Sequence, residues 1–111
     1  MPLFHSVLYV PWRGLNECGA GVREPVTRSV KKVPHQRVFL VEEQLRSTPR
    51  IGSWHERMSG REMLARVPSG HGVELSDGED TCRLSVVEVD HLREEARTAL
   101  HDARARRYPY Q

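Results

Sequence analysis

Residues 23–37 hold the densest group of positive side chains in the sequence, with five Arg or Lys residues and one histidine against a single glutamate. Arginine binds phosphate and carboxylate groups through its planar fork of donors, and lysine binds them as a point charge. A second basic group follows at residues 104–107. The residues predicted to contact a protein or nucleic-acid partner are Arg23, Arg28, Lys31, Lys32, Arg37, Arg104, Arg106, Arg107 and Tyr108.

Two kinds of partner suit these side chains. Basic residues interleaved with aromatic ones are typical of proteins that bind single-stranded nucleic acid, because charges follow the phosphates and rings stack on the bases. The available rings are Trp12, Trp54, Tyr108 and Tyr110, although the two tryptophans also suit the edge of a core. The same charges could instead pair with acids of this chain or dock an acidic protein surface.

Histidines close to cations raise a third hypothesis, a small endoribonuclease toxin. Such an enzyme needs a general acid and base with a few cations around a phosphodiester. His35 lies near Lys32 and Arg37 in the sequence, and His55 lies near Arg57. The same residues occur on any basic surface, so we expect no catalytic residue. The enzyme is therefore the third hypothesis, after the two binding hypotheses.

No pattern in the sequence predicts a metal site or a cofactor. The six histidines lack the short spacing of a zinc site, and the acids of residues 74–80 surround an Asp-Gly turn without the spacing of an EF-hand. Cys18 and Cys82 have no CxxC partner, so we expect reduced thiols, with Cys82 buried. Phosphate loops of the GxGxxG and Walker types are absent.

The size and composition predict one domain. The 111 residues suffice for a single compact domain over residues 1–111, with residues 108–111 as a tail that could fray. Hydrophobic residues at 38% and charged residues at 29% are typical of a folded soluble protein. The sequence has neither an apolar run of about 18 residues nor a secretory leader, so we expect no membrane association and a cytoplasmic location in a bacterium or an infected host cell.

The basic residues are mostly arginine, with 15 Arg against 2 Lys. This bias is what GC-rich codons produce, and it suggests a GC-rich bacterium or its phage. The bias also weakens a functional interpretation of arginine, since arginine then stands where another genome would encode lysine.

Charge is distributed along the chain in blocks of opposite sign. Residues 13–37 carry six positive and two negative side chains, whereas residues 74–95 carry two positive and eight negative ones. Our leading hypothesis is a non-enzymatic regulatory or inhibitory binding protein, of the phage anti-defence type, that masks a surface of another macromolecule. A protein is the expected partner, nucleic acid is the alternative, and a homodimer through the C-terminal helix is a further expectation.

The first half of the chain predicts strands joined by a long loop. Residues 3–10 are apolar on both faces and predict a central strand ended by Pro11, followed by a glycine-containing loop over residues 12–25. Residues 26–33 fit either a helix or a strand, and we favour a strand with Lys31 and Lys32 on opposite sides. Residues 37–43 predict a strand covered on both faces.

The second half predicts two helices around a hairpin. After a loop at residues 44–53, S-x-x-E spacings from Ser53 and Ser59 predict a turn and then a helix over residues 60–67. Residues 73–76 and 81–89 alternate around an Asp-Gly-Glu-Asp turn and predict a hairpin. Asp90 is expected to cap a C-terminal helix whose apolar stripe comprises Leu92, Ala96, Ala99, Leu100 and Ala103.

These elements predict the α+β class, with a small and mostly antiparallel sheet of four to five strands, a short middle helix and a long C-terminal amphipathic helix. The sequence does not say whether the basic residues converge in space. A contiguous basic patch would favour nucleic acid, whereas charge blocks that neutralise each other would favour protein docking.

Overall fold

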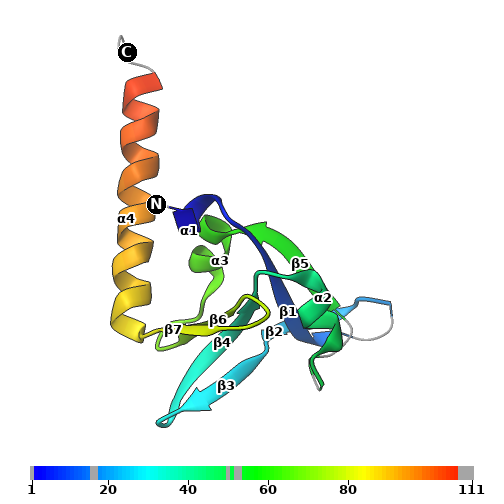
Figure 1. Ribbon diagram of the computed structural model, residues 1–111. Helices are drawn as coiled ribbons and strands as arrows, with labels where there is room; N and C mark the ends of the chain where they lie inside the picture. Colours follow the sequence, from blue (N-terminus) through cyan, green and yellow to red (C-terminus); the bar gives the residue numbers. More distant parts are fainter. Residues whose placement is uncertain (1, 16–17, 50, 52–53, 108–111) are drawn as a thin grey trace.

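The computed structural model describes the backbone of residues 2–15, 18–49, 51 and 54–107, and the side chains within these ranges except those of residues 2–3 and 99–107. The elements lie in one mixed α+β arrangement (Figure 1). In chain order they are α1 (Pro2–His5), β1 (Val7–Leu15), β2 (Gly21–Pro25), β3 (Thr27–Val30), β4 (Val33–Phe39), α2 (Glu42–Ser47), β5 (Trp54–Ser59), α3 (Gly60–Arg66), β6 (Gly72–Ser76), β7 (Thr81–Leu84) and α4 (Val86–Arg107).

The seven strands form one sheet in which β1 and β4 are central. Strand β1 pairs with β5 along six consecutive positions on one edge, and on its other edge it meets β4 at Tyr9↔Phe39 and β2 further along. Strand β4 pairs with β6 in parallel, and β6 continues into the antiparallel hairpin with β7. The remaining pairs are antiparallel, so the sheet is mixed.

Strands β2 and β3 are the two halves of a bent segment that passes from β1 to β4. Strand β2 pairs with β1 and β3 pairs with β4, and only Val26 separates them. Val26 is 1% exposed, and its carbonyl accepts a hydrogen bond from the Arg37 amide at 2.8 Å. The bend anchors β3 against β4, and the hairpin of β3 and β4 extends away from the rest of the fold (Figure 1).

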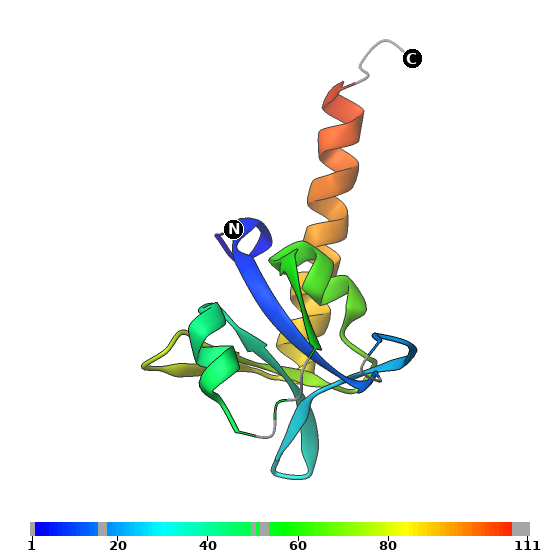
Figure 2. The same cartoon turned by 90° about the vertical axis from the view of Figure 1, so that its right-hand side faces the viewer.

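One side of the sheet, which we call the helix face, carries the main core. Alternate residues of the strands, such as Leu8, Val10, Val38 and Val73, point to this side and are fully buried there. Helices α3 and α4 cover them with Met63, Leu64, Val89, Leu92 and Ala96. Helix α4 contributes to this core as far as Ala96, and it then continues to Arg107 and rises beyond the rest of the fold (Figure 2).

The other side, the open face, is covered only at one end. Helix α2 and the segment after it place Leu45 and Ile51 over Phe39 and Val26, with Tyr9 packed against this smaller core. Strand β4 is therefore buried on both sides near its end, as expected for residues 37–43, although β4 itself stops at Phe39. The part of the open face formed by β3, β6 and β7 carries polar and charged side chains.

The α+β class is confirmed, and the sheet is larger than the four to five strands expected. Strand β1 begins later than residue 3 and continues through Pro11 to Leu15, because the fixed φ of proline is compatible with an extended strand. Residues 54–59 form strand β5 where a turn was expected. Helix α2 occupies part of the expected loop at residues 44–53.

Caps were predicted at the starts of α3 and α4, and the structure shows which residues cap each helix. The α3 prediction is confirmed, since the Ser59 hydroxyl accepts from the Glu62 amide at 3.2 Å. The α4 prediction is wrong in its start, because the helix is capped by Ser85, five residues before Asp90. Ser85 and Glu88 form a capping box with mutual bonds of 3.2 and 3.3 Å. Strand β7 consequently ends at Leu84 instead of residue 89.

Candidate nucleic-acid interface

A row of charged side chains crosses the open face over four neighbouring strands, β3, β4, β6 and β7. Arg37 of β4 lies opposite Glu74 of β6, and Glu74 lies opposite Arg83 of β7. Arg28 of β3 lies opposite His35, which is two residues from Arg37 and therefore on the same side of the sheet. The register thus brings three arginines from separate strands onto one surface.

Glu74 is the centre of this group, which we call the arginine cluster (Arg28, Arg37, Arg83 and Glu74). The Glu74 side chain is 1% exposed, and one of its oxygens accepts from Nε of Arg83 at 3.2 Å. The other oxygen lies 3.5 Å from Arg28 and 3.6 Å from Arg37. Three positive charges meet one negative charge, which leaves two positive charges uncompensated within the cluster.

Arg37 is the most buried cation of the cluster. Its guanidinium lies 5.4 Å from the centre of the Phe39 ring, a cation–π distance, and its Nε has no hydrogen-bond partner among the described residues. Burial lowers the pKa of Arg37, the positive charges of Arg28 and Arg13 lower it further, and Glu74 opposes the shift. The main cause of the lowered pKa is therefore burial, and the neighbouring positive charges add to it.

Two lysines form the hairpin tip, defined as Lys31 and Lys32. They are the only residues between the paired Val30 and Val33, and their φ angles are 51° and 66°. Two successive positive φ angles are what a type I′ hairpin turn requires, a conformation that asparagine and glycine adopt far more readily than lysine. Both side chains are exposed and make no ion pair with any residue that the structure describes.

A groove lies between the hairpin tip and the start of α4, and we call it the α4 groove. Its volume is about 570 Å³, and it combines valines with cationic side chains and the first residues of the helix. It is lined by Val30, Lys31, Val33, His35, Arg83, Ser85, Val86, Val87 and Glu88. Arg83 belongs to both the groove and the arginine cluster, so the two features are continuous.

His35 is held in a defined orientation at the base of the groove. Its side chain is 7% exposed, and Nδ1 lies 2.9 Å from the Val33 carbonyl, which can only accept a hydrogen bond. Nδ1 therefore carries the hydrogen in this contact. The ring lies against the backbone of β6, where a Cβ at Gly72 would come within 2.6 Å of Nε2 and 2.5 Å of the Leu84 carbonyl oxygen. Glycine at this position makes room for the imidazole.

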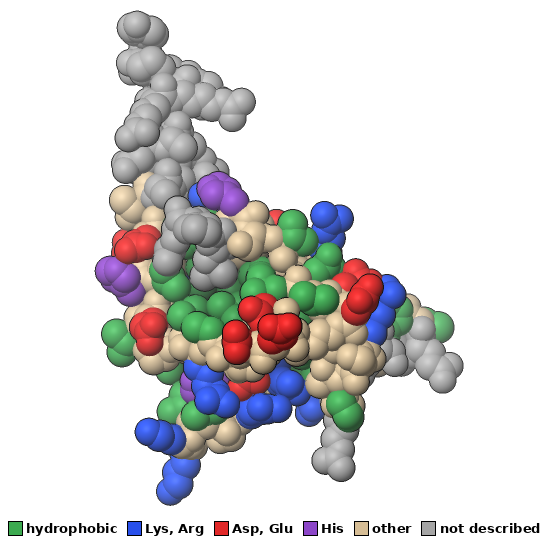
Figure 3. Space-filling view, in the orientation of Figure 1, with side chains coloured by type: hydrophobic (Ala, Val, Ile, Leu, Met, Phe, Trp, Pro, Cys, Tyr) green, Lys and Arg blue, Asp and Glu red, His purple; other side chains and the backbone are tan. Residues whose placement is uncertain are grey.

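Figure 3 shows the charge distribution in the orientation of Figure 1. Lys and Arg side chains gather along the lower side of the molecule around a carboxylate and continue toward the tip of the β3–β4 hairpin. Acidic side chains lie above this group. The basic surface is therefore contiguous across elements that are far apart in the sequence.

The structure brings together some of the residues predicted to bind a partner and separates others. Arg28, Lys31, Lys32 and Arg37 lie on the open face or at its tip. Arg23 lies on β2 in an ion pair with Glu56, which also accepts from Arg66 of α3, so Arg23 does not join them. The side chains of Arg104, Arg106 and Arg107, and all of Tyr108, lie outside the described residues.

Arg83 belongs to the arginine cluster and to the α4 groove, but it was not among the residues predicted to bind a partner. Nothing local in the sequence indicates the parallel pairing of β4 with β6, which places Arg37 and Arg83 on either side of Glu74. The expectation that Lys31 and Lys32 lie on opposite sides of a strand is wrong, because both lie in the turn.

Other candidate residues have different environments. Trp12 is buried in the main core and Trp54 packs against it, so neither forms an open stacking surface. His55 lies 4.0 Å from Glu42 instead of beside Arg57 in a cationic cleft. Cys18 and Cys82 are both exposed and are not joined to each other by a disulfide, and the exposure of Cys82 corrects the expectation that it is buried.

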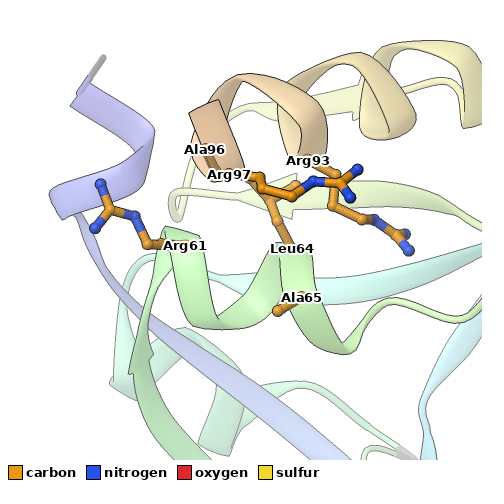
Figure 4. Close-up of a pocket in the computed structure, with 6 residues that line it drawn as sticks. All are labelled: Arg61, Leu64, Ala65, Arg93, Ala96 and Arg97. Atoms are coloured by element: carbon orange, nitrogen blue, oxygen red, sulfur yellow. The ribbon is translucent and has the colours of Figure 1, made fainter. Parts of the chain in front are cut away.

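A second cavity, of about 450 Å³, lies between α3 and α4 (Figure 4). Its lining residues are Arg61, Leu64, Ala65, Arg93, Ala96 and Arg97. Arg93 donates to the Val67 carbonyl at 3.0 Å, and Arg97 pairs with Glu94 of its own helix. Figure 4 shows Arg61 pointing away from the other two arginines, so the three cations do not converge on one ligand position.

Within the described ranges, His, Cys, Asp and Glu side chains form no group of three or more that could hold a metal ion. The helices of the described chain include none with the length and apolar composition needed to cross a membrane. Comparisons of the chain with protein-family models, with curated proteins and with solved structures find no match.

Proposed function

We propose that this protein binds nucleic acid through its open face and performs no chemical step on it. The observation that carries the proposal is the convergence of Arg28, Arg37 and Arg83 on the single buried carboxylate of Glu74. The hairpin tip adds two further positive charges next to the cluster. A contiguous positive surface of this kind attracts the regularly spaced charges of a phosphate backbone.

The exposure of the arginines supports contact with phosphates. The side chains of Arg28 and Arg83 are 50% and 48% exposed, so each can bind Glu74 on one side and a phosphate on the other. Glu74 holds the guanidinium groups in place, which reduces the side-chain entropy lost on binding. The cluster is therefore pre-organised for anions although it contains an acid.

An acidic protein surface is the second candidate ligand of the same face. Arginine is enriched in protein interfaces, and partly exposed arginines on an uncovered sheet face suit such an interface. In that case the protein would act as the regulatory or inhibitory binding protein of our leading sequence hypothesis, by masking an acidic surface. The contiguity of the basic surface favours nucleic acid as the first ligand to test.

The test is fluorescence anisotropy of labelled single-stranded RNA, single-stranded DNA and duplex DNA at about 50 and 200 mM salt. We expect binding at the lower salt and a steep loss at the higher salt, because each phosphate contact releases a counterion. Absence of binding to all three probes at about 50 mM salt would overturn the proposal and direct the search to protein partners.

Matched variants locate the binding surface. Lys31→Gln with Lys32→Gln removes two charges from the hairpin tip and should lower the slope of log K against log salt by about 2. Arg66→Gln with Arg97→Gln removes two charges from the helices on the other side of the sheet and should leave affinity and slope nearly unchanged. Equal loss in both double variants would contradict binding by the open face.

A further inference from the structure

The α4 groove combines four kinds of group that bind phosphate. The first is the start of α4, a helix of 22 residues, whose Val86 and Val87 line the groove. The amides of these two residues precede the first intrahelical bond, which runs from Val89 to the Ser85 carbonyl at 2.9 Å. The capping box uses the Glu88 amide and leaves the earlier two amides at the positive end of the helix dipole.

His35 is the second group. It is more than nine-tenths buried, it lines the groove, and Nε2 has no hydrogen-bond partner among the residues that the structure describes. Its orientation is determined by the Val33 carbonyl and by the space at Gly72. A buried, oriented imidazole with a free nitrogen is suited to binding a ligand oxygen.

The third and fourth groups are the Lys31 ammonium and the Arg83 guanidinium. Arg83 uses Nε to bind Glu74, so its terminal nitrogens remain available. Glu88 is the one carboxylate in the lining, and it already accepts a hydrogen bond from the Ser85 amide at 3.3 Å. The positive groups outnumber it, so the groove favours an anion over a cation.

The walls of the groove are apolar. Val30, Val33 and Val87 contribute branched side chains, and Val87 is 76% exposed although it carries no polar group. The volume of about 570 Å³ is in the usual range of small-molecule sites. An apolar wall beside a phosphate site matches the two parts of a nucleotide, a flat base and a charged phosphate.

We infer that the α4 groove holds one unpaired nucleotide of a single-stranded nucleic acid, with its phosphate at the start of α4 and its base against the valines. This inference rests on the proposed function, in which the arginine cluster follows the neighbouring phosphates. A duplex keeps its bases stacked inside and presents none to such a groove, so single strands are the substrate class.

Val87→Asp tests the inference. The new carboxylate would stand at the mouth of the groove and repel a phosphate, while an acid in the first turn suits the helix dipole and should preserve the fold. The matched control is Val22→Asp on β2, a substitution that makes the same change in net charge. Val22 is 77% exposed and does not line the groove.

We expect Val87→Asp to weaken the affinity for single-stranded RNA about tenfold relative to Val22→Asp, with little difference between the two variants for duplex DNA. Adenosine 5′-monophosphate added to the ¹⁵N-labelled protein should shift the amide signals of Val86 and Val87, whereas adenosine alone should not.

The results distinguish a failure of the groove assignment from a failure of the proposed function. Salt-sensitive binding of the unaltered protein with equal single-strand affinities for Val87→Asp and Val22→Asp would overturn the groove assignment and leave the proposed function standing. No binding of any nucleic acid would overturn both. Amide shifts confined to residues outside the α4 groove would also contradict the assignment.

Discussion

At the scale of single residues, Glu74 has the most unusual environment. It is a fully buried carboxylate on a basic surface, and among the residues that the structure describes its ion-pair partners are arginines from three strands. Removing one partner from a buried ionic group is far more destabilising than losing an exposed ion pair, because the remaining charges stay desolvated. Glu74 is therefore expected to contribute to stability and to the orientation of the binding groups.

Glu74→Gln should lower the free energy of unfolding by about 3 kcal/mol, since the three arginines would then repel one another at close range. Urea unfolding measures this change, and added salt should restore part of it by screening. Glu79→Gln in the exposed β6–β7 turn is the control and should have little effect. Equal stability of both variants would show that the arginines do not depend on Glu74.

At the scale of elements, the β3–β4 hairpin combines strain with charge. Lysine occupies both positive-φ positions of a turn for which asparagine and glycine are better suited. Strained backbone persists where the surrounding structure enforces it, and such positions cluster at functional sites. The two lysines therefore lower the stability of the turn and place two positive charges at an exposed tip.

Lys31→Asn with Lys32→Gly should raise the free energy of unfolding by about 1 kcal/mol, because asparagine and glycine adopt the left-handed conformation with less strain than lysine. The same variant should bind single-stranded RNA more weakly, since both tip charges are lost. Thermal unfolding and anisotropy measure the two effects. The double glutamine variant separates them, because it removes the charges without relieving the strain. A variant that is less stable than the unaltered protein would contradict this account of the turn.

At the scale of the whole molecule, α4 packs against both the sheet and helix α3. Its first three turns place Val89, Leu92 and Ala96 in the main core against the sheet and α3. This part of the predicted apolar stripe is buried within one chain, so it is not free to form the expected homodimer. Ala99, Leu100 and Ala103 were also predicted to belong to the apolar stripe, but their side chains lie outside the part of the chain that the structure describes.

Leu92→Asp should therefore unfold the protein or cost several kcal/mol, which is comparable to the whole stability of a small domain. Leu92 is 7% exposed, whereas Val87 of the same helix is 76% exposed. Val87→Asp is the matched control and should melt near the temperature of the unaltered protein. Circular dichroism at several protein concentrations measures both variants, and a concentration-dependent melting temperature would indicate that α4 also mediates association.

The elements confirmed from the sequence are those with local signals. The Ser59 cap and the helix formers after it predicted α3, and the alternation around residues 77–80 predicted the β6–β7 hairpin. The start of α4 was misplaced although Ser85 and Glu88 have the same S-x-x-E spacing as Ser59 and Glu62, whereas Asp90 is followed three positions later by Arg93. Strand β5 carried a capping spacing and lacked the apolar alternation of a strand.

Local sequence patterns predicted the α+β class, helix α3 and the β6–β7 hairpin, which the structure confirms. They also named Arg28, Lys31, Lys32 and Arg37 as candidate binding residues, and their binding role stays a prediction. The tertiary structure alone decided that Arg23 pairs with Glu56, that Arg83 and Glu74 join the site, and that the tip lysines occupy a strained turn. The physical reason is the range of the interactions. Caps and periodicity act between residues a few positions apart, whereas the parallel pairing of β4 with β6 depends on burial of the whole sheet.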